Sequence, residues 1–457
     1  MKRVLVTIMI VAILSGALVI PASAANYTHV ADELNGLGLF QGTDSGYDLG
    51  SAPNRIQAVV MLIRLLGLET EALACDSEHP FADVSGWQAP YVAYAFENKL
   101  TTGVSDTEFN PNGVCTAQMY VTYVLRALGY SSEPGGEFTY AGAVEFGKSL
   151  GIIDDLLANG QFLRDQMVAV SYLALAAAPN GGDFACLLEK LAAEGAVAQS
   201  AAAALLNKLA LFGEFGAAFS GLIDEPAIAV NANFASDAGA MGALLAATGI
   251  DVNMSADADM SMIRGDVTKA AANLVITQSG KDQEVQVYFT GDKLYVNNDG
   301  EKSVMDSPDP SIINSIKAVL GQFSFAPYII SDMSKDAKSD SVVYTVAVAD
   351  GYIAAAIDML FAAMGSMDTS DMGVGDIGLG NLDPADIDIS VANSDLKFYT
   401  DSNGVLNKAV LACDLVLKIE MGGVPISLTI SLSLDFEVTG TGDDVTVDFP
   451  DDLDDYS

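Results

Sequence analysis

The chain has 457 residues and a formal net charge of −39, with 60 acidic against 21 basic side chains. So acidic a protein excludes nucleic acid as a natural partner, because phosphate binding needs a basic footprint. The hydrophobic fraction of 51% and the charged fraction of 18% exclude general disorder, and the length predicts two or three domains.

Residues 1–24 have the pattern of a secretory signal peptide. Lys2 and Arg3 precede an apolar run that extends to Ile20, and the small residues that follow favour cleavage after Ala24. We therefore predict a secreted protein without a membrane span after signal cleavage, since no later segment approaches the ~18 consecutive apolar residues that a span needs. An uncleaved membrane anchor is the alternative.

Residues 26–178 contain three copies of one helix–turn–helix pattern, at about 26–70, 80–130 and 138–178. In the first copy Val59, Leu62, Ile63 and Leu66 recur at spacings of three and four, which is typical of a helix with one apolar face. Such a helix pair can bury that face only against its neighbours. We expect the three copies to fold together as one all-α unit.

Residues 179–225 are predicted to be a helical extension and linker, with a connector from Gly213 to Pro226. The hydrophobic period then changes to two, most clearly at 283–289, and turn sequences such as Ser402-Asn403-Gly404 separate the predicted strands. Residues 226–457 are therefore predicted to form an α+β domain with an antiparallel sheet and helices at 311–320 and 354–364. Residues 365–386 are predicted to be flexible and the acidic C-terminal tail to be solvated.

Four cysteines are too few for a disulfide scaffold. Cys75 and Cys115 lie in one region, and a bridge between them would stabilise the fold by roughly 3–4 kcal/mol in the chain-entropy model. We take this pair as a disulfide candidate and expect Cys186 and Cys413 to be buried thiols.

Little catalytic chemistry is available. The two histidines, His29 and His79, do not have metal-ligand spacing, and no nucleophile or phosphate-loop motif occurs. We expect no enzymatic activity, no cofactor and no metal site. Paired carboxylates of a wall hydrolase remain an alternative in so acidic a chain, although no pair stands out.

Several residues match a known family. Phe81-Ala82-Asp83-Val84 with Trp87, and Gly103 with Phe109 and Pro111, resemble the motifs of S-layer homology repeats. Arg55 and Arg164 occupy the arginine position of that family's Thr-Arg-Ala-Glu motif. The resemblance covers roughly residues 26–178.

This resemblance implies a pseudo-threefold helical bundle whose grooves hold pyruvylated sugars of a secondary cell wall polysaccharide. It implies that Arg55 and Arg164 grip the ketal carboxylate, which suits a planar guanidinium, and that Trp87 stacks on a sugar. Asp83 and Gly103 complete the predicted glycan-binding set. Local ion pairs for the arginines, a core position for Trp87 and a helix-cap role for Asp83 are the alternatives.

The chain departs from the family motif in two respects. The second copy places Thr116 in the arginine position, so at most two grooves should be strong. Glutamine replaces the motif glutamate in all three copies, at Gln57, Gln118 and Gln166.

The C-terminal half more faintly resembles the LolA/LppX-like fold, a curved antiparallel sheet with helices across its concave side. The matching segments are 288–296, the turn at 401–404 and 447–450. The resemblance implies an enclosed apolar ligand, with a ligand-free spacer domain as the alternative.

The function predicted from the sequence is non-covalent anchoring of a secreted protein to the cell wall or S-layer surface of a Gram-positive-type bacterium. The partner is an acidic wall polysaccharide, and the β-rich domain is displayed outward. The alternative is an extracellular carrier of a lipid or small apolar ligand, tethered by the repeats.

Overall fold

A computed structural model describes residues 27–43, 46–159, 161–240, 242–243, 253–265, 268–291, 293–306, 326–338, 341–349, 352, 387–421 and 424–456. The predicted signal peptide at 1–24 lies outside these residues. So do the helices predicted at 311–320 and 354–364 and the segment predicted to be flexible at 365–386.

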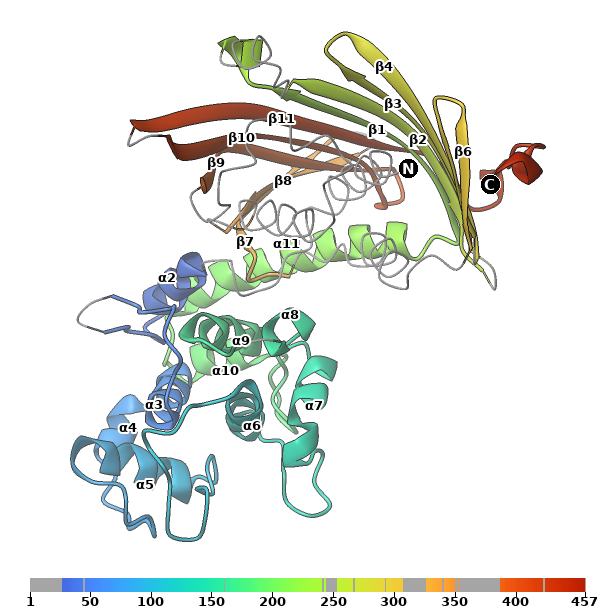
Figure 1. Ribbon diagram of the computed structural model, residues 1–457. Helices are drawn as coiled ribbons and strands as arrows, with labels where there is room; N and C mark the ends of the chain where they lie inside the picture. The colour runs from blue at the N-terminus through green and yellow to red at the C-terminus, as the bar shows by residue number, and fades with distance from the viewer. Residues whose placement is uncertain are drawn as a thin grey trace. The chain divides into compact units, whose positions relative to one another are not determined.

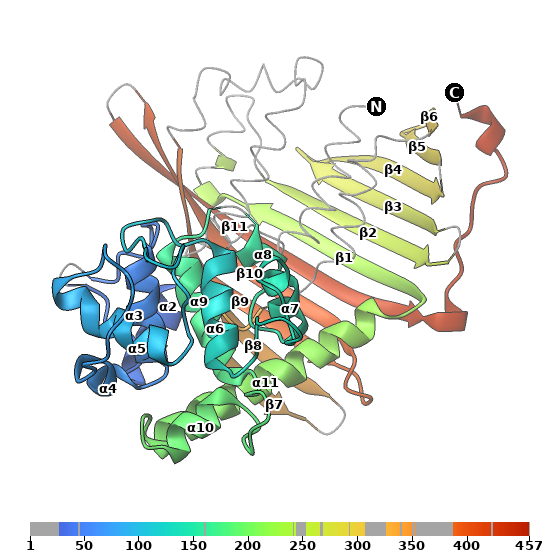
Figure 2. The ribbon, with the colours of Figure 1, turned by 90° about the horizontal axis from the view of Figure 1, so that it is seen from below.

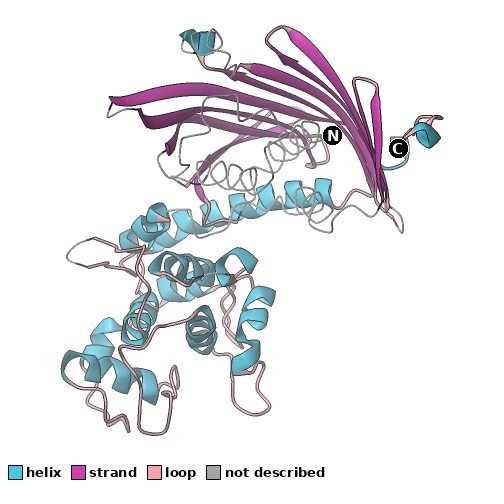
Figure 3. Ribbon diagram, viewed as in Figure 1, coloured by secondary structure: helices cyan, strands magenta, loops and turns pink. Residues whose placement is uncertain are grey.

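The chain divides into two compact units. Among the described residues, the helical unit comprises those up to Phe212 together with 326–331. The sheet unit comprises the described residues of 213–325 and those from Asp332 onward. The multidomain α+β class predicted from the sequence is confirmed, with helices in the N-terminal half and a large antiparallel sheet in the C-terminal half (Figure 3).

Most helices of the helical unit occupy positions that the apolar spacing predicts, whereas the short helices Glu69–Leu73 and Asp155–Ala158 are not predicted by it (Figure 1). The helices are α2 (Thr28–Gly36), α3 (Arg55–Leu65), α4 (Glu69–Leu73), α5 (Ala89–Glu97), α6 (Ala117–Ala127), α7 (Ala143–Ser149), α8 (Asp155–Ala158), α9 (Arg164–Ala176), α10 (Leu187–Ala193) and the first part of α11 (Gln199–Ile223). Short 3₁₀ turns, η1 (Gly86–Gln88) and η2 (Tyr140–Gly142), lead into α5 and α7.

Helix α3 shows why these segments begin and end where they do. The Asn54 side chain accepts a hydrogen bond from the Gln57 N–H, and the Gln57 side chain accepts one from the Asn54 N–H, which completes a capping box. After the last turn the chain reverses at Gly67, whose φ of 68° favours glycine.

Helix α9 is the centre of the helical unit. It contacts α2, α3, α6, α8 and α10, and its residues from Arg164 to Leu175 are all buried. A helix that is covered on every side belongs to a core, so the other helices are arranged around it.

The predicted connector after Gly213 is wrong, because α11 continues to Ile223 and β1 starts four residues later. Phe215, Phe219 and Leu222 recur at helical spacing and are buried, and this packing outweighs the poor helix propensity of the glycines between them. The Phe215 and Phe219 rings lie 5.1 and 5.6 Å from the ring of Phe398.

Within the described residues, one stretch, Gln199–Leu222 of α11, is long and apolar enough to cross a membrane by length and composition alone. This is weak evidence for a span, because core helices of soluble proteins pass the same test. Two of its charged side chains make ion pairs, Lys208 with Glu33 and Glu214 with Lys335.

In the part of the chain that the structure describes, the sheet has eleven strands in the order β6-β5-β4-β3-β2-β1-β11-β10-β9-β8-β7. Two meanders, β1 to β6 and β7 to β11, join where β1 pairs with β11, and every pairing described is antiparallel (Figures 1 and 2). The strands are β1 (Ala227–Asp237), β2 (Met254–Ile263), β3 (Lys269–Gln278), β4 (Lys281–Thr290), β5 (Lys293–Asn298), β6 (Glu301–Asp306), β7 (Ile330–Ala337), β8 (Val342–Val348), β9 (Ile387–Thr400), β10 (Leu406–Met421) and β11 (Val424–Thr441).

One face of β1 to β5 is apolar and buried. Alternate residues of these strands, such as Phe234, Ile276, Val285 and Val296, form a single cluster. Most residues between them are polar, as at Asn233, so the predicted period of two is present.

The C-terminal tail is not solvated as predicted. The Phe449 ring lies 6.0 Å from Tyr288, and the Tyr456 ring lies 5.6 Å from Tyr295 and is only 6% exposed. Lys302 makes an ion pair with Asp452 in the same segment. Two aromatic anchors therefore hold an otherwise acidic tail against β4, β5 and β6.

Candidate functional site

The predicted site residue Arg55 lies in the first turn of α3, where α3 meets the loop at 109–113. The backbone N–H groups of Arg55 and Ile56 donate to the carbonyls of Gly113 and Pro111, at 2.9 and 3.1 Å. The Arg55 side chain donates from Nε to the Phe109 carbonyl at 2.8 Å, and its guanidinium carbon lies 4.8 Å from the centre of the Phe109 ring. Arg55 thus ties the first helical stretch (26–70) to the second (80–130).

Arg55 is only 4% exposed. One terminal nitrogen donates to Met119 Sδ at 3.5 Å, and the other, Nη2, is buried without a hydrogen-bond partner among the described residues. The open bidentate grip predicted for this arginine is therefore not available in this structure. What remains for a ligand is the buried amino group of Nη2 and the positive charge.

Asp83 fixes the same loop from the other side. Its carboxylate accepts hydrogen bonds from the N–H groups of Phe109 and Asn110, at 2.9 and 2.7 Å. Partial burial alone would raise the pKa of Asp83, but these two bonds and the charge of Arg55 outweigh it and hold the pKa below its usual value. Asp83 orders the loop and does not cap a helix.

Trp87 is a predicted site residue whose side chain is largely exposed to solvent. It is 62% exposed in η1, so the alternative that it fills the core is wrong. Its ring meets the ring of Tyr91 edge-on at 6.3 Å, and the Tyr91 hydroxyl donates to Glu69 at 2.6 Å. An exposed indole supported in this way offers a flat apolar face to a ligand.

Gly103 makes a tight turn and has no side chain to offer a ligand. Its φ is 78°, and a Cβ atom there would lie 2.3 Å from Cε1 of Phe81 and 2.7 Å from the Glu108 carbonyl. The turn holds Phe81 beside Phe109, whose rings are 5.9 Å apart. Gly103 therefore has a structural role, because it lets Phe81 pack closely against this turn.

Arg164 repeats the arrangement of Arg55 at the start of α9. Its backbone N–H donates to Ser51 and its Nε donates to the Tyr47 carbonyl at 3.0 Å. The residue is 5% exposed. Burial lowers the pKa of the guanidinium, and the charge of Asp48 opposes the shift. Arg164 joins the third stretch (138–178) to the first, through a backbone carbonyl instead of an ion pair.

The register predicted for the second stretch is wrong by one residue. Thr116 is the N-cap of α6, because its hydroxyl accepts the Met119 N–H at 3.3 Å. Ala117 therefore holds the first helical position, which Arg55 and Arg164 hold in α3 and α9. Gln118 is at the second position and donates to the Tyr140 carbonyl at 2.6 Å. This contact between stretches has no guanidinium.

Asp165 is a buried residue that the sequence reasoning missed. It follows Arg164 in the first turn of α9, is 6% exposed, and accepts the Tyr27 N–H at 3.0 Å. Burial raises the pKa of its carboxyl to about 7, and the Tyr27 bond opposes the shift only in part. No sequence motif marks this residue; only the complete burial of α9 reveals it.

The predicted Cys75–Cys115 disulfide is not formed, and both thiols are free. Each sulfur has a different neighbour: Cys75 Sγ lies 3.7 Å from Glu97 Oε2, and Cys115 Sγ lies 3.7 Å from the Thr116 carbonyl. Burial raises the pKa of the Cys115 thiol to about 12, which makes it unreactive. Cys186 is buried as predicted, whereas Cys413 is half-buried.

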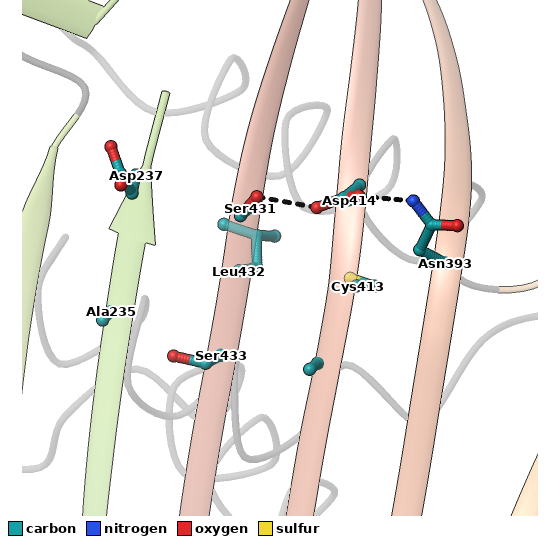
Figure 4. A pocket seen from close by; sticks show the side chains of 9 residues that line it. Ala235, Asp237, Asn393, Cys413, Asp414, Ser431, Leu432 and Ser433 are labelled. Atoms are coloured by element: carbon teal, nitrogen blue, oxygen red, sulfur yellow. Dashed lines mark hydrogen bonds between the residues drawn. The ribbon is translucent and has the colours of Figure 1, made fainter. Parts of the chain in front are cut away.

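A second candidate is a pocket of about 270 Å³ on the sheet (Figure 4). There Asp414 accepts hydrogen bonds from Asn393 and Ser431, each 2.7 Å long, and Asp237 lies on the neighbouring strand. These two bonds lower the pKa of Asp414. Because both carboxylate oxygens are already occupied, and no cluster of metal-ligand side chains occurs within the described ranges, this pocket is a weaker site than the helical one.

Comparison with known families identifies one segment of the helical unit. Residues 80–116, the segment that contains Asp83, Trp87, Gly103 and Phe109, match the S-layer homology domain. The chain therefore carries an S-layer homology domain in that segment.

Two curated proteins are similar over short stretches. The chain is 29% identical over 119 residues to the middle cell wall protein of Brevibacillus brevis, a match that covers 25% of this chain and 11% of that protein. It is 36% identical over 76 residues to an endoglucanase of a Bacillus species, covering 17% of this chain and 8% of the enzyme. The matches thus span about a tenth of each relative's length.

A solved structure, LprF from Mycobacterium bovis, aligns with 52% of this chain and 94% of its own length at 11% identity. The TM-score is 0.25. A score this low does not establish a shared fold for the sheet unit.

We expect Gly103→Ala to lower the free energy of unfolding by more than about 2 kcal/mol, because it adds a steric clash to the strain of a positive φ. Gly135→Ala is the matched control: its φ is 86°, but nothing lies within 4 Å of the added Cβ. It should cost only about 1 kcal/mol. Denaturant unfolding followed by circular dichroism measures both, and equal losses would contradict the clash.

We expect Asp165→Asn to change how stability depends on pH. The folded-state pKa of about 7 lies above the ordinary value of 3.8. Burial of the carboxyl therefore costs the wild-type protein no stability below pH 4, where the group is protonated, and the free energy of unfolding falls as the pH rises towards 7. The variant should gain roughly 1–3 kcal/mol at pH 8 and nothing at pH 4. The control is Asp183→Asn, the same change at an exposed position. Thermal unfolding of wild type and both variants between pH 4 and pH 8 measures the effect. A difference between Asp165→Asn and wild type that does not change with pH would contradict the assignment.

Proposed function

We propose that this protein anchors itself non-covalently to a bacterial cell wall, and that residues 26–178 act as three S-layer homology repeats. The partner we propose is an acidic, pyruvylated wall polysaccharide, with the β-rich domain displayed outward. The single observation that carries the proposal is the exposed Trp87 in the matched segment, which also contains Asp83 and the loop at 109–113 that Asp83 and Arg55 hold in place.

The geometry around Arg55 and Arg164 supports a repeat arrangement. In both α3 and α9 the first helical residue is an arginine that donates from Nε to a backbone carbonyl of another stretch. In α6 the corresponding turn makes its contact through Gln118. These contacts run from the first stretch to the second, from the second to the third, and from the third to the first, as a pseudo-threefold bundle requires.

We propose a different role for the arginines from the bidentate grip that the family resemblance implies. The carboxylate of the sugar would be attracted by the charge of Arg55 and could reach its unpartnered Nη2 after a small movement of neighbouring side chains. The sugar ring itself would rest on Trp87. The carboxylate is then recognised by short-range attraction to Arg55, and the sugar ring by contact with Trp87. Short-range attraction suits a chain whose net charge repels anions at longer range.

We also propose that the chain is not an enzyme, on the ground that its two histidines and its described carboxylates form no recognisable catalytic set. The name of the endoglucanase relative does not bear on this, because the match covers only 8% of that enzyme. A clearing band in a wall zymogram would overturn this proposal.

A second candidate function is that of a carrier for an apolar ligand. The observation in its favour is the continuous apolar face of β1 to β5. Native mass spectrometry of the full chain purified from its host would detect a bound lipid. A spectrum without added mass, together with no lipid in an organic extract, would count against the carrier.

For wall anchoring we expect Trp87→Ala to weaken binding to purified cell-wall sacculi at least tenfold, because a large aromatic contact is lost. Folding should be preserved, since the side chain is mostly exposed. Arginine variants test this less well: Arg55→Ala would leave the Phe109 carbonyl without its donor, so lost binding could reflect lost structure.

Tyr140→Ala is the matched control, because Tyr140 is a 48% exposed aromatic beside the contact that lacks an arginine. It should bind nearly as well as wild type. Wild-type protein should also lose binding to sacculi from which mild acid has removed pyruvate. Unchanged pelleting of Trp87→Ala would refute the site, and equal binding before and after acid would refute the acidic ligand.

A further inference from the structure

The helical unit contains a pocket of about 200 Å³ that lies away from the arginine contacts. Arg55 and Arg164 lie where α3 and α9 begin, whereas this pocket is lined by residues where α3, α5 and α6 end and by α10. It is therefore distinct from the proposed wall-glycan site.

The extension after the S-layer homology-like region completes the pocket. The Asn180 N–H donates to the Leu128 carbonyl at the end of α6, at 2.7 Å. A Cβ atom on Gly67, just after α3, would lie 2.4 Å from the Cβ of Ala196. Residues 180–196 thus pack directly on the ends of α3 and α6, and α10 is fixed as one wall.

The pocket combines a floor of buried leucines with two cations, and its accessible lining is mostly polar. Leu100, Leu187 and Leu191 are buried in the floor, Arg126 and Lys190 are half-buried, and Glu194 lies exposed at the rim. Arg126 donates only to neutral groups, the Ser132 hydroxyl at 2.8 Å and the Leu100 carbonyl at 3.3 Å. Lys190 makes no ion pair with any described residue.

Neither cation makes an ion pair with a described carboxylate, although the charge of Glu133 acts on Arg126. Both are in the last turns of helices, where the helix dipole favours positive charge. Yet Arg64 and Lys148 also lie in last turns, and each has a carboxylate within 2.8 Å. The dipole therefore does not explain why Arg126 and Lys190 lack one.

We propose that this pocket binds a small organic monocarboxylate whose carboxylate meets Arg126 and Lys190 and whose apolar body rests on the leucine floor. Charge-assisted bonds to a guanidinium and an ammonium suit a carboxylate, and a few convergent polar groups over an apolar surface are typical of small-molecule sites. The small volume admits a short chain or one ring, and Glu194 at the rim disfavours a second negative charge.

The test is a titration of the full chain with hexanoate, followed by saturation-transfer NMR, with hexan-1-ol as the uncharged probe. The variant is Lys190→Gln, which removes one charge from a half-buried position. The matched control is Lys148→Gln, the same change outside the pocket. Wild type should bind hexanoate, Lys190→Gln should raise its Kd about fivefold or more, Lys148→Gln should leave it unchanged, and hexan-1-ol should bind more weakly.

Absence of hexanoate binding to wild type would overturn the proposal. So would equal affinity of wild type and Lys190→Gln, which would place any binding elsewhere, for example on the sheet unit. Equal affinity for hexan-1-ol would show that the carboxylate is not recognised. A lower melting temperature of Lys190→Gln with unchanged hexanoate affinity would assign the lysine to the helix end alone.

Discussion

The helical unit depends on buried guanidinium groups that bond to backbone carbonyls across the boundaries between its stretches. A carbonyl such as that of Phe109 loses its water when two helical stretches pack, and an unsatisfied buried acceptor costs about 1–3 kcal/mol. Arg55 supplies the missing donor from the first turn of α3, and Arg164 does the same for Tyr47 from α9. The same residues that resemble a ligand-binding motif therefore also hold the fold together.

This double use changes how an anionic ligand can be recognised. A guanidinium whose Nε is already committed and whose carbon lies over a phenyl ring cannot swing out to meet a ligand without loosening the boundary. The positive charge is nevertheless retained, and among the described residues no carboxylate makes an ion pair with Arg55. With Arg55 fixed in this way, the proposed specificity for an acid depends on electrostatic attraction to the guanidinium and not on a flexible clamp.

Much of the fold could be predicted because helices and strands bury apolar residues at different spacings. Val59 and Leu62 mark α3, and the alternation at 283–289 marks β4. The register of α6 could not be predicted, because Thr116 suits both the cap and the position after it, and only the bond from Met119 decides. The environment of Asp165 and the docking of Tyr456 depend on contacts between residues far apart in sequence, and burial of that kind leaves no local pattern. The motif identifies Trp87 as a site residue, but only the structure shows that its side chain is exposed.

The join between β1 and β11 has a consequence for export. Ile228 pairs with Thr441, so the middle of the sheet forms between segments roughly 200 residues apart, while each meander closes locally. For a chain that crosses a membrane from its N-terminus, the first meander would emerge with the unpaired edge of β1 open to other chains until the last strand follows. For a chain exported in this way, a seam that closes late makes the interval after translocation the period of greatest exposure to aggregation.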